Sequence, residues 1–120
     1  MKKAIAVVLL VVGINFSAQA QEVKTISLEQ TKGAFVQESL TLEEGTYVFE
    51  IANKNVGHDI GFVLAPKGKP EEAHHIKDAY VTKTVATNSK EKSKEVTLKK
   101  GEYIYFCPLN PTPEYTLIVK

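Results

Sequence analysis

The chain has 120 residues, 43% of them hydrophobic, and a formal net charge of +1 from 15 basic and 14 acidic residues. This size fits one domain with its own core, and the balanced charge argues against a nucleic-acid partner. The single cysteine excludes an internal disulfide.

The N-terminus has the pattern of a secretory signal peptide. Met1-Lys2-Lys3 precede an apolar run from Ala4 to Ile14, and a polar stretch ends in Ala18-Gln19-Ala20. The run is too short to span a bilayer. We expect residues 1–20 to be the signal, residues 21–120 to be one domain without a membrane span, and the mature protein to be periplasmic or secreted. Loss of Lys2 and Lys3 lowers the basic count from 15 to 13 against 14 acidic residues, which leaves about one negative charge.

The rest of the chain alternates apolar and polar residues with the period of β-strands. We predict an all-β, antiparallel Greek-key β-sandwich of about seven to eight strands. A short helical turn is expected within residues 70–77, after Pro70. The candidate strands, in chain order, are Val23–Leu28, Phe35–Leu42, Thr46–Ala52, Asp59–Ala65, Tyr80–Thr87, Lys94–Leu98, Glu102–Cys107 and Tyr115–Val119.

Two strand starts resemble each other, Leu-Glu-Glu-Gly-Thr-Tyr at 42–47 and Leu-Lys-Lys-Gly-Glu-Tyr at 98–103. They predict two similar corners of one sandwich. Alternation places Tyr103, Tyr105 and Cys107 on one face of their strand, so the sulfur should emerge beside Tyr105.

The lysine-rich segment from Lys83 to Lys100 is interrupted by Glu91 and Glu95. Its simplest interpretation is an edge strand that charges protect from pairing with other chains. A basic docking patch for a redox partner is the alternative.

Two residues with metal-binding side chains stand at predicted strand ends. His58 follows Asn53-Lys-Asn-Val-Gly57 and precedes a strand, whereas Cys107 ends a strand and enters a loop with Pro108, Asn110, Pro111 and Pro113. A type 1 copper site needs a thiolate and two imidazoles on a stiff scaffold, usually with a weak axial thioether. Strand ends joined by short loops supply such stiffness.

In these motifs and their strand order the chain resembles the cupredoxin family, in a plastocyanin- or amicyanin-like form with the short ligand loop of amicyanin. The resemblance implies that His58 and Cys107 are candidate copper ligands. It also implies a second histidine three residues after the cysteine and a methionine six residues after it. Asn110 and Pro113 occupy these positions, so the type 1 site is incomplete. His74 or His75 would supply an imidazole only if the chain returned from the far end of the sandwich.

Each candidate residue also has a purely structural interpretation. Cys107 can be a small buried hydrophobic residue, and His58 can bind a loop carbonyl. The Asn110 amide can bridge two loops by hydrogen bonds without any metal.

Three classes of function follow. The first is an exported binding module without electron transfer, which acts on an envelope protein or a small ligand. The second is a copper protein, either a Cu(I) carrier through Cys107 and His58 or an electron-transfer protein with noncanonical ligands. The third, hydrolysis with Cys107 as nucleophile and His58 as base, lacks an oxyanion-hole motif, so we expect no enzyme activity.

Overall fold

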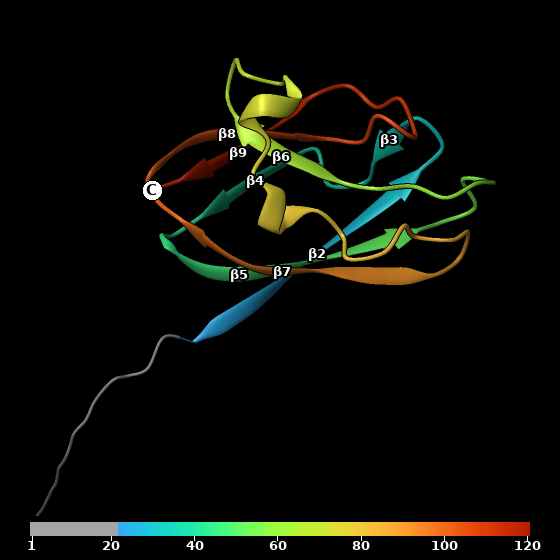
Figure 1. The fold of residues 1–120 in the computed structure, drawn as a ribbon, viewed down its shortest axis with the longest axis horizontal. Helices are drawn as coiled ribbons and strands as arrows, with labels where there is room; N and C mark the ends of the chain where they lie inside the picture. Colours follow the sequence, from blue (N-terminus) through green and yellow to red (C-terminus); the bar gives the residue numbers. More distant parts are fainter. Residues whose placement is uncertain (1–21) are drawn as a thin grey trace, which may run out of the picture.

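The computed structural model describes residues 22–120, and the expected signal peptide lies outside this range. Two four-stranded sheets pack face to face and form a β-sandwich (Figure 1). The predicted all-β sandwich is therefore confirmed. Within residues 22–120, the chain contains no helix with the length and apolar character needed to cross a membrane.

The first sheet has the strand order β3-β2-β5-β7 and the second has the order β4-β9-β8-β6. The strands of the first sheet are β3 (Ala34–Phe35), β2 (Val23–Thr31), β5 (Gly45–Asn53) and β7 (Lys90–Leu98). The strands of the second sheet are β4 (Ser39–Leu42), β9 (Tyr115–Val119), β8 (Gly101–Phe106) and β6 (Val63–Pro66).

The sheets are mixed rather than purely antiparallel. Strand β2 pairs parallel with β5, and β4 pairs parallel with β9, whereas the other pairings between named strands are antiparallel. Parallel neighbours need a long crossover. Period-two alternation describes faces and carries no information on strand direction, so the sequence did not reveal these two pairings.

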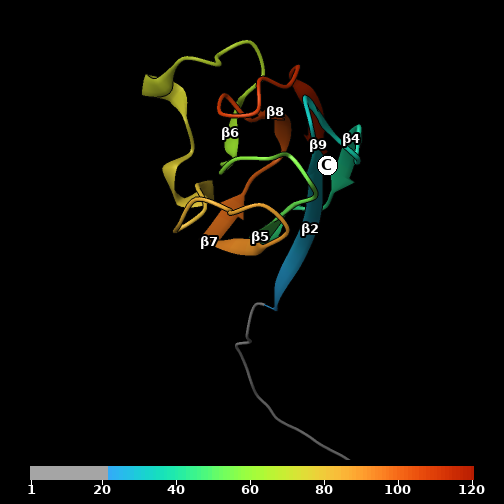
Figure 2. The ribbon, with the colours of Figure 1, turned by 90° about the vertical axis from the view of Figure 1, so that its right-hand side faces the viewer.

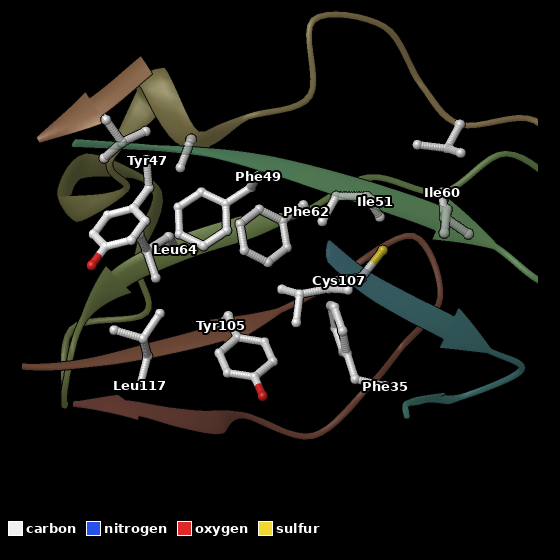
Figure 3. Close-up of a cluster of buried hydrophobic side chains, with 14 of the residues drawn as sticks. Phe35, Tyr47, Phe49, Ile51, Ile60, Phe62, Leu64, Tyr105, Cys107 and Leu117 are labelled. Atoms are coloured by element: carbon white, nitrogen blue, oxygen red, sulfur yellow. The ribbon is translucent and has the colours of Figure 1, made fainter. Parts of the chain in front are cut away.

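The core lies between the sheets and follows the predicted alternation. Tyr47, Phe49 and Ile51 of β5 all turn inward, with 4%, 0% and 0% exposure. Tyr105 and Cys107 turn inward from the opposite sheet (Figure 3). Hydrophobic burial of this kind is the main favourable term in folding.

The two similar strand starts form matching corners. The Tyr47 hydroxyl donates to the Glu43 carbonyl oxygen at 2.7 Å, and the Tyr103 hydroxyl donates to the Lys99 carbonyl oxygen at 2.7 Å. The sequence similarity therefore corresponds to one repeated hydrogen bond.

Three predicted strands differ from the structure. The segment 80–87 is no strand and contributes only the isolated bridges of Val81 with Ser93 and of Val85 with Ile60. The strand expected at 59–65 is regular only from Val63 to Pro66. The strand expected at 35–42 is broken into β3 and β4, because the Val36 amide turns back to the Glu29 carbonyl oxygen.

The segment between β6 and β7 covers the side of the sandwich. It contains two 3₁₀ turns, Glu72–His74 and Lys77–Ala79, so the predicted helical turn is confirmed. Figure 2 shows this segment beside β6, away from the edge that holds β4. We call residues 70–82 the flank.

Strand β7 carries half of the lysine-rich segment and lies at the edge of its sheet. Its charged side chains alternate with the buried Ser93, Val96 and Leu98. The predicted edge position is confirmed, and protection from pairing with other chains stays a prediction.

Candidate metal centre

Cys107 follows the last residue of β8 and is fully buried. Its sulfur points into the core toward the side that holds Ile51 and Ile60 (Figure 3). The Gly61 amide donates a hydrogen bond to this sulfur at 3.3 Å. The thiol therefore lies beneath the surface loops with one polar neighbour.

The loop after Cys107 is closed by its own hydrogen bonds. The Cys107 amide donates to Thr112 Oγ1 at 3.0 Å, and the Thr112 amide donates to the Cys107 carbonyl oxygen at 3.3 Å. Thr112 Oγ1 donates in turn to the Pro113 carbonyl oxygen at 3.0 Å. Pro113 is exposed and offers no side-chain donor atom to a metal.

His58 is exposed, whereas the Cys107 sulfur is buried, and the hydrogen bond of the His58 ring goes to a backbone carbonyl and not to this sulfur. Its Nδ1 lies 3.0 Å from the Asp59 carbonyl oxygen. Since a carbonyl only accepts, Nδ1 carries the proton in this bond, and Nε2 of the neutral ring keeps its lone pair. Asn53 Nδ2 fixes the backbone here by donating to the His58 carbonyl oxygen at 2.8 Å.

Asn110 is 2% exposed, and its amide bridges the loop to the β2–β3 hairpin. Its Oδ1 accepts from the Gly33 amide at 2.7 Å. Its Nδ2 donates to the Thr31 carbonyl oxygen at 2.8 Å and to Gln30 Oε1 at 3.1 Å. The amide bridge expected from the sequence is thus present, although it reaches the hairpin turn and not the His58 loop.

Gln30 extends this network to the cysteine. Its Nε2 donates to the Gly61 carbonyl oxygen at 2.8 Å, and the Gly61 amide donates to Cys107 Sγ. Buried amides are costly unless their polar atoms have partners. The network therefore fixes the positions of Asn110 and Cys107 relative to each other.

His75 returns close to β8 but on its outer side. Its ring centroid lies 6.0 Å from that of Phe106, whose side chain alternates with the inward Tyr105 and Cys107. Its ring nitrogens lie 2.7 Å from the Tyr80 hydroxyl and 2.7 Å from the Pro70 carbonyl oxygen. These protein contacts occupy both nitrogens, and the exposed His74 is at the end of its 3₁₀ turn.

Gln30 was missed from the sequence, and Asn53 was recognised only as the start of the motif before His58, without a role of its own. Both lie on the inward face of their strands, Gln30 two residues after Leu28 and Asn53 two residues after Ile51. The signal in the sequence was an amide side chain at a position that alternation predicts to be buried. Asn53 donates to the His58 and Val85 carbonyl oxygens and accepts from the Val56 amide.

A cupredoxin-like domain model matches residues 4–119. The chain belongs to the cupredoxin-like family. No protein with a curated description matches the chain.

Solved structures similar to this cupredoxin-like chain include two auracyanins and an azurin. Auracyanin B is 20% identical, with a TM-score of 0.66 over 86% of this chain and 92% of that chain. Auracyanin A, a "blue" copper protein from the green thermophilic photosynthetic bacterium Chloroflexus aurantiacus, is 17% identical, with a TM-score of 0.66 over 82% and 100%. An azurin from the obligate methylotroph Methylomonas sp. strain J is 18% identical, with a TM-score of 0.52 over 80% and 97%. At these identities the likeness shows the fold alone.

The residues of this cupredoxin-like domain do not fit a type 1 copper centre. Among residues 22–120, no three His, Cys, Asp or Glu side chains gather where they could hold a metal ion. Where the family resemblance implies a second imidazole, the Asn110 amide is bound to three protein groups. An amide oxygen is also a harder and weaker donor than the imidazole that copper prefers.

Proposed function

We propose that this cupredoxin-like domain acts by binding a partner or ligand and not by transferring electrons or catalysing a reaction. The supporting observation is the Asn110 amide, which joins the loop to the β2–β3 hairpin through three hydrogen bonds. This end of the sandwich is held together by protein groups at the position where the family resemblance implies an imidazole ligand.

The test is to add Cu(II) to the purified domain, residues 21–120, and to record the visible spectrum. A copper thiolate with two good nitrogen ligands has an intense charge-transfer band, and we expect no such band. The proposal is wrong if one equivalent of Cu(II) produces this band, or if the protein isolated from its host is blue with stoichiometric copper.

The second candidate function is copper binding, by a Cu(I) carrier or by an electron-transfer protein with noncanonical ligands. It is favoured by the Cys107 sulfur, a soft ligand that Cu(I) prefers, and by the lone pair of His58 Nε2. Competition with a Cu(I) chelator tests it. A carrier requires that Cys107→Ala and His58→Ala each weaken Cu(I) binding, and equal affinities for wild type and Cys107→Ala eliminate it.

We also propose that the protein is exported and that residues 1–20 are a cleaved signal peptide. The charged, apolar and small-residue regions of this segment support the proposal. An envelope protein is then a candidate partner. The mass of the protein purified from its host should correspond to a chain that starts at Gln21, and a mass that includes residues 1–20 would contradict cleavage.

A further inference from the structure

A hollow of about 370 Å³ lies between the flank and the sheet that contains β6. Its walls come from three parts of the chain that are distant in sequence, residues 61–63, 72–81 and 108–109. Figure 2 shows the flank on the side of β6 where these parts meet. The volume lies within the range of small-molecule sites, about 300–1,000 Å³.

The flank that forms the outer wall is attached to both sheets. In its middle the Ile76 amide donates to the Leu64 carbonyl oxygen of β6 at 2.8 Å. At its C-terminal end the Thr82 amide donates to the Lys92 carbonyl oxygen of β7 at 3.0 Å, next to the bridge between Val81 and Ser93. The wall is therefore formed without a ligand, which lowers the entropic cost of binding.

Hydrogen bonds assign the proton positions of the His75 and Tyr80 side chains. The Pro70 carbonyl only accepts, so His75 Nε2 donates to it. Nδ1 of the neutral ring is then an acceptor, and the Tyr80 hydroxyl donates to it at 2.7 Å. The Tyr80 oxygen has no further proton to give, and its lone pairs leave it an acceptor for a ligand.

Glu72 adds a second acceptor to the same wall. Burial, and then the negative charge of Glu72, raises the pKa of Tyr80 above its usual value. Glu72 and Tyr80 both line the hollow. Among the described residues, no lysine lines the hollow. The Gly61 amide and carbonyl are already bonded to Cys107 and Gln30. Both His75 nitrogens are engaged as well, so the side-chain groups left for a ligand are the Tyr80 oxygen and the Glu72 carboxylate, and both are acceptors.

The remaining walls are mostly apolar and include Val63, Val81, Pro108 and Leu109. Leu109 is 52% exposed, which leaves a large apolar side chain at the rim for a ligand to cover. A Cβ at Gly61 would make an ordinary contact with the rim, 3.7 Å from Leu109 Cδ1. A larger side chain there would project toward the rim.

We propose that this hollow binds a small organic ammonium ion whose apolar body contacts Val63, Val81 and Leu109 and whose N–H groups donate to the Tyr80 oxygen and the Glu72 carboxylate. The shape of the hollow then selects the apolar part of the ligand, and the two acceptors select its positive charge. This ligand class rests on the proposed binding function and specifies where and what the domain binds.

The test uses two probes with the same phenylethyl group and opposite charge, 2-phenylethylammonium and 3-phenylpropanoate, in amide NMR titrations of the full domain. We expect saturable shifts for residues 61–63, 72–81 and 108–109 with the ammonium ion. Its dissociation constant should be about tenfold lower than that of the carboxylate, since a hydrogen bond to a charged group contributes strongly. Equal affinities, no binding, or shifts centred on other residues would overturn the inference.

Three variants test the assigned contacts. Tyr80→Phe should weaken ammonium binding about tenfold, and Glu72→Gln only about two- to fivefold, because Glu72 is exposed. Gly61→Val adds a branched side chain to the wall beside Leu109 and should weaken binding of the ammonium ion. The matched control is Tyr103→Phe, which removes a tyrosine hydroxyl bonded far from the hollow, to Lys99, and should leave the affinity unchanged. Wild-type affinity in a folded Tyr80→Phe variant would contradict the proposal.

Copper and amine titrations separate this inference from the proposed function. A domain that stays colourless with Cu(II) and does not bind the ammonium ion loses only the inference. A domain that turns blue loses the proposed function, whatever it does with the amine.

Discussion

The side-chain amides of Gln30 and Asn110, eighty positions apart in the chain, form a direct hydrogen bond of 3.1 Å in the interior. Gln30 is fully buried and Asn110 is 2% exposed. The pair connects the C-terminal loop to the first strand of the sandwich and, through Gly61, to the sulfur of Cys107. In this chain, the loop where the cupredoxin resemblance implies metal ligands is therefore held by hydrogen bonds of side-chain amides.

Asn110→Ala should lower the free energy of unfolding by about 2–4 kcal/mol, because it removes three hydrogen bonds and leaves buried donors and acceptors without partners. Urea unfolding measures this loss. Leu109→Ala is the control in the same loop, since its exposed side chain should contribute less than about 1 kcal/mol. Equal losses for both variants would show that the amide network does not stabilise the loop.

Asn110→His combined with Pro113→Met should bind Cu(II) with a visible thiolate band that the wild type lacks. The variant restores the imidazole and the thioether that the cupredoxin resemblance implies, in a loop of the short type. Visible absorption during a Cu(II) titration checks this outcome. Asn110→His alone is the matched variant and should give a weaker band. A folded, colourless double variant would mean that positions 110 and 113 do not converge on Cys107.

The Cys107 thiol should not react with a bulky disulfide reagent in the native protein, because it has no exposed surface. Labelling should begin only as urea unfolds the chain and should follow the unfolded fraction. The control is Cys107→Ala with Leu109→Cys, which places a thiol at an exposed position of the same loop and should label at once. Rapid labelling of the native wild type would contradict the buried position.

Stability should depend on Tyr105 at alkaline pH. Burial, and then the neighbouring Tyr115 and Glu38, raises the pKa of Tyr105 to about 12, against about 10 in an unfolded chain. Between these values the unfolded state loses the proton and the native state keeps it. The contribution of Tyr105 is therefore complete below pH 10 and is lost as the pH rises toward 12.

Urea unfolding at a series of pH values measures this effect. Tyr105→Phe should show a shallower fall of the unfolding free energy between pH 10 and 12 than the wild type. At pH 8 it should lose only about 1 kcal/mol, from the hydrogen bond that its hydroxyl donates to the Gln37 carbonyl oxygen at 2.6 Å. Parallel pH profiles would mean that Tyr105 does not titrate as described.

Strand faces were predictable where one side of a strand is buried. Tyr47, Phe49 and Ile51 share the inward face of β5 as alternation predicts, and Tyr105 and Cys107 share that of β8. The segment 80–87 has a similar composition but forms only isolated bridges. Its two ends are held by different neighbours, β7 and the His58 loop, and local periodicity does not report such distant partners.

The position of Cys107 at the end of an inward-facing strand followed from the sequence alone, because alternation along one strand is a local property. The family membership likewise agrees with motifs that were readable in the chain. The tertiary structure decided which groups those residues meet: Gln30 beside Asn110, the Gly61 amide at the sulfur, and His75 on the outer side of β8. These contacts join segments that are far apart in sequence, and only packing of the whole chain brings them within hydrogen-bonding distance.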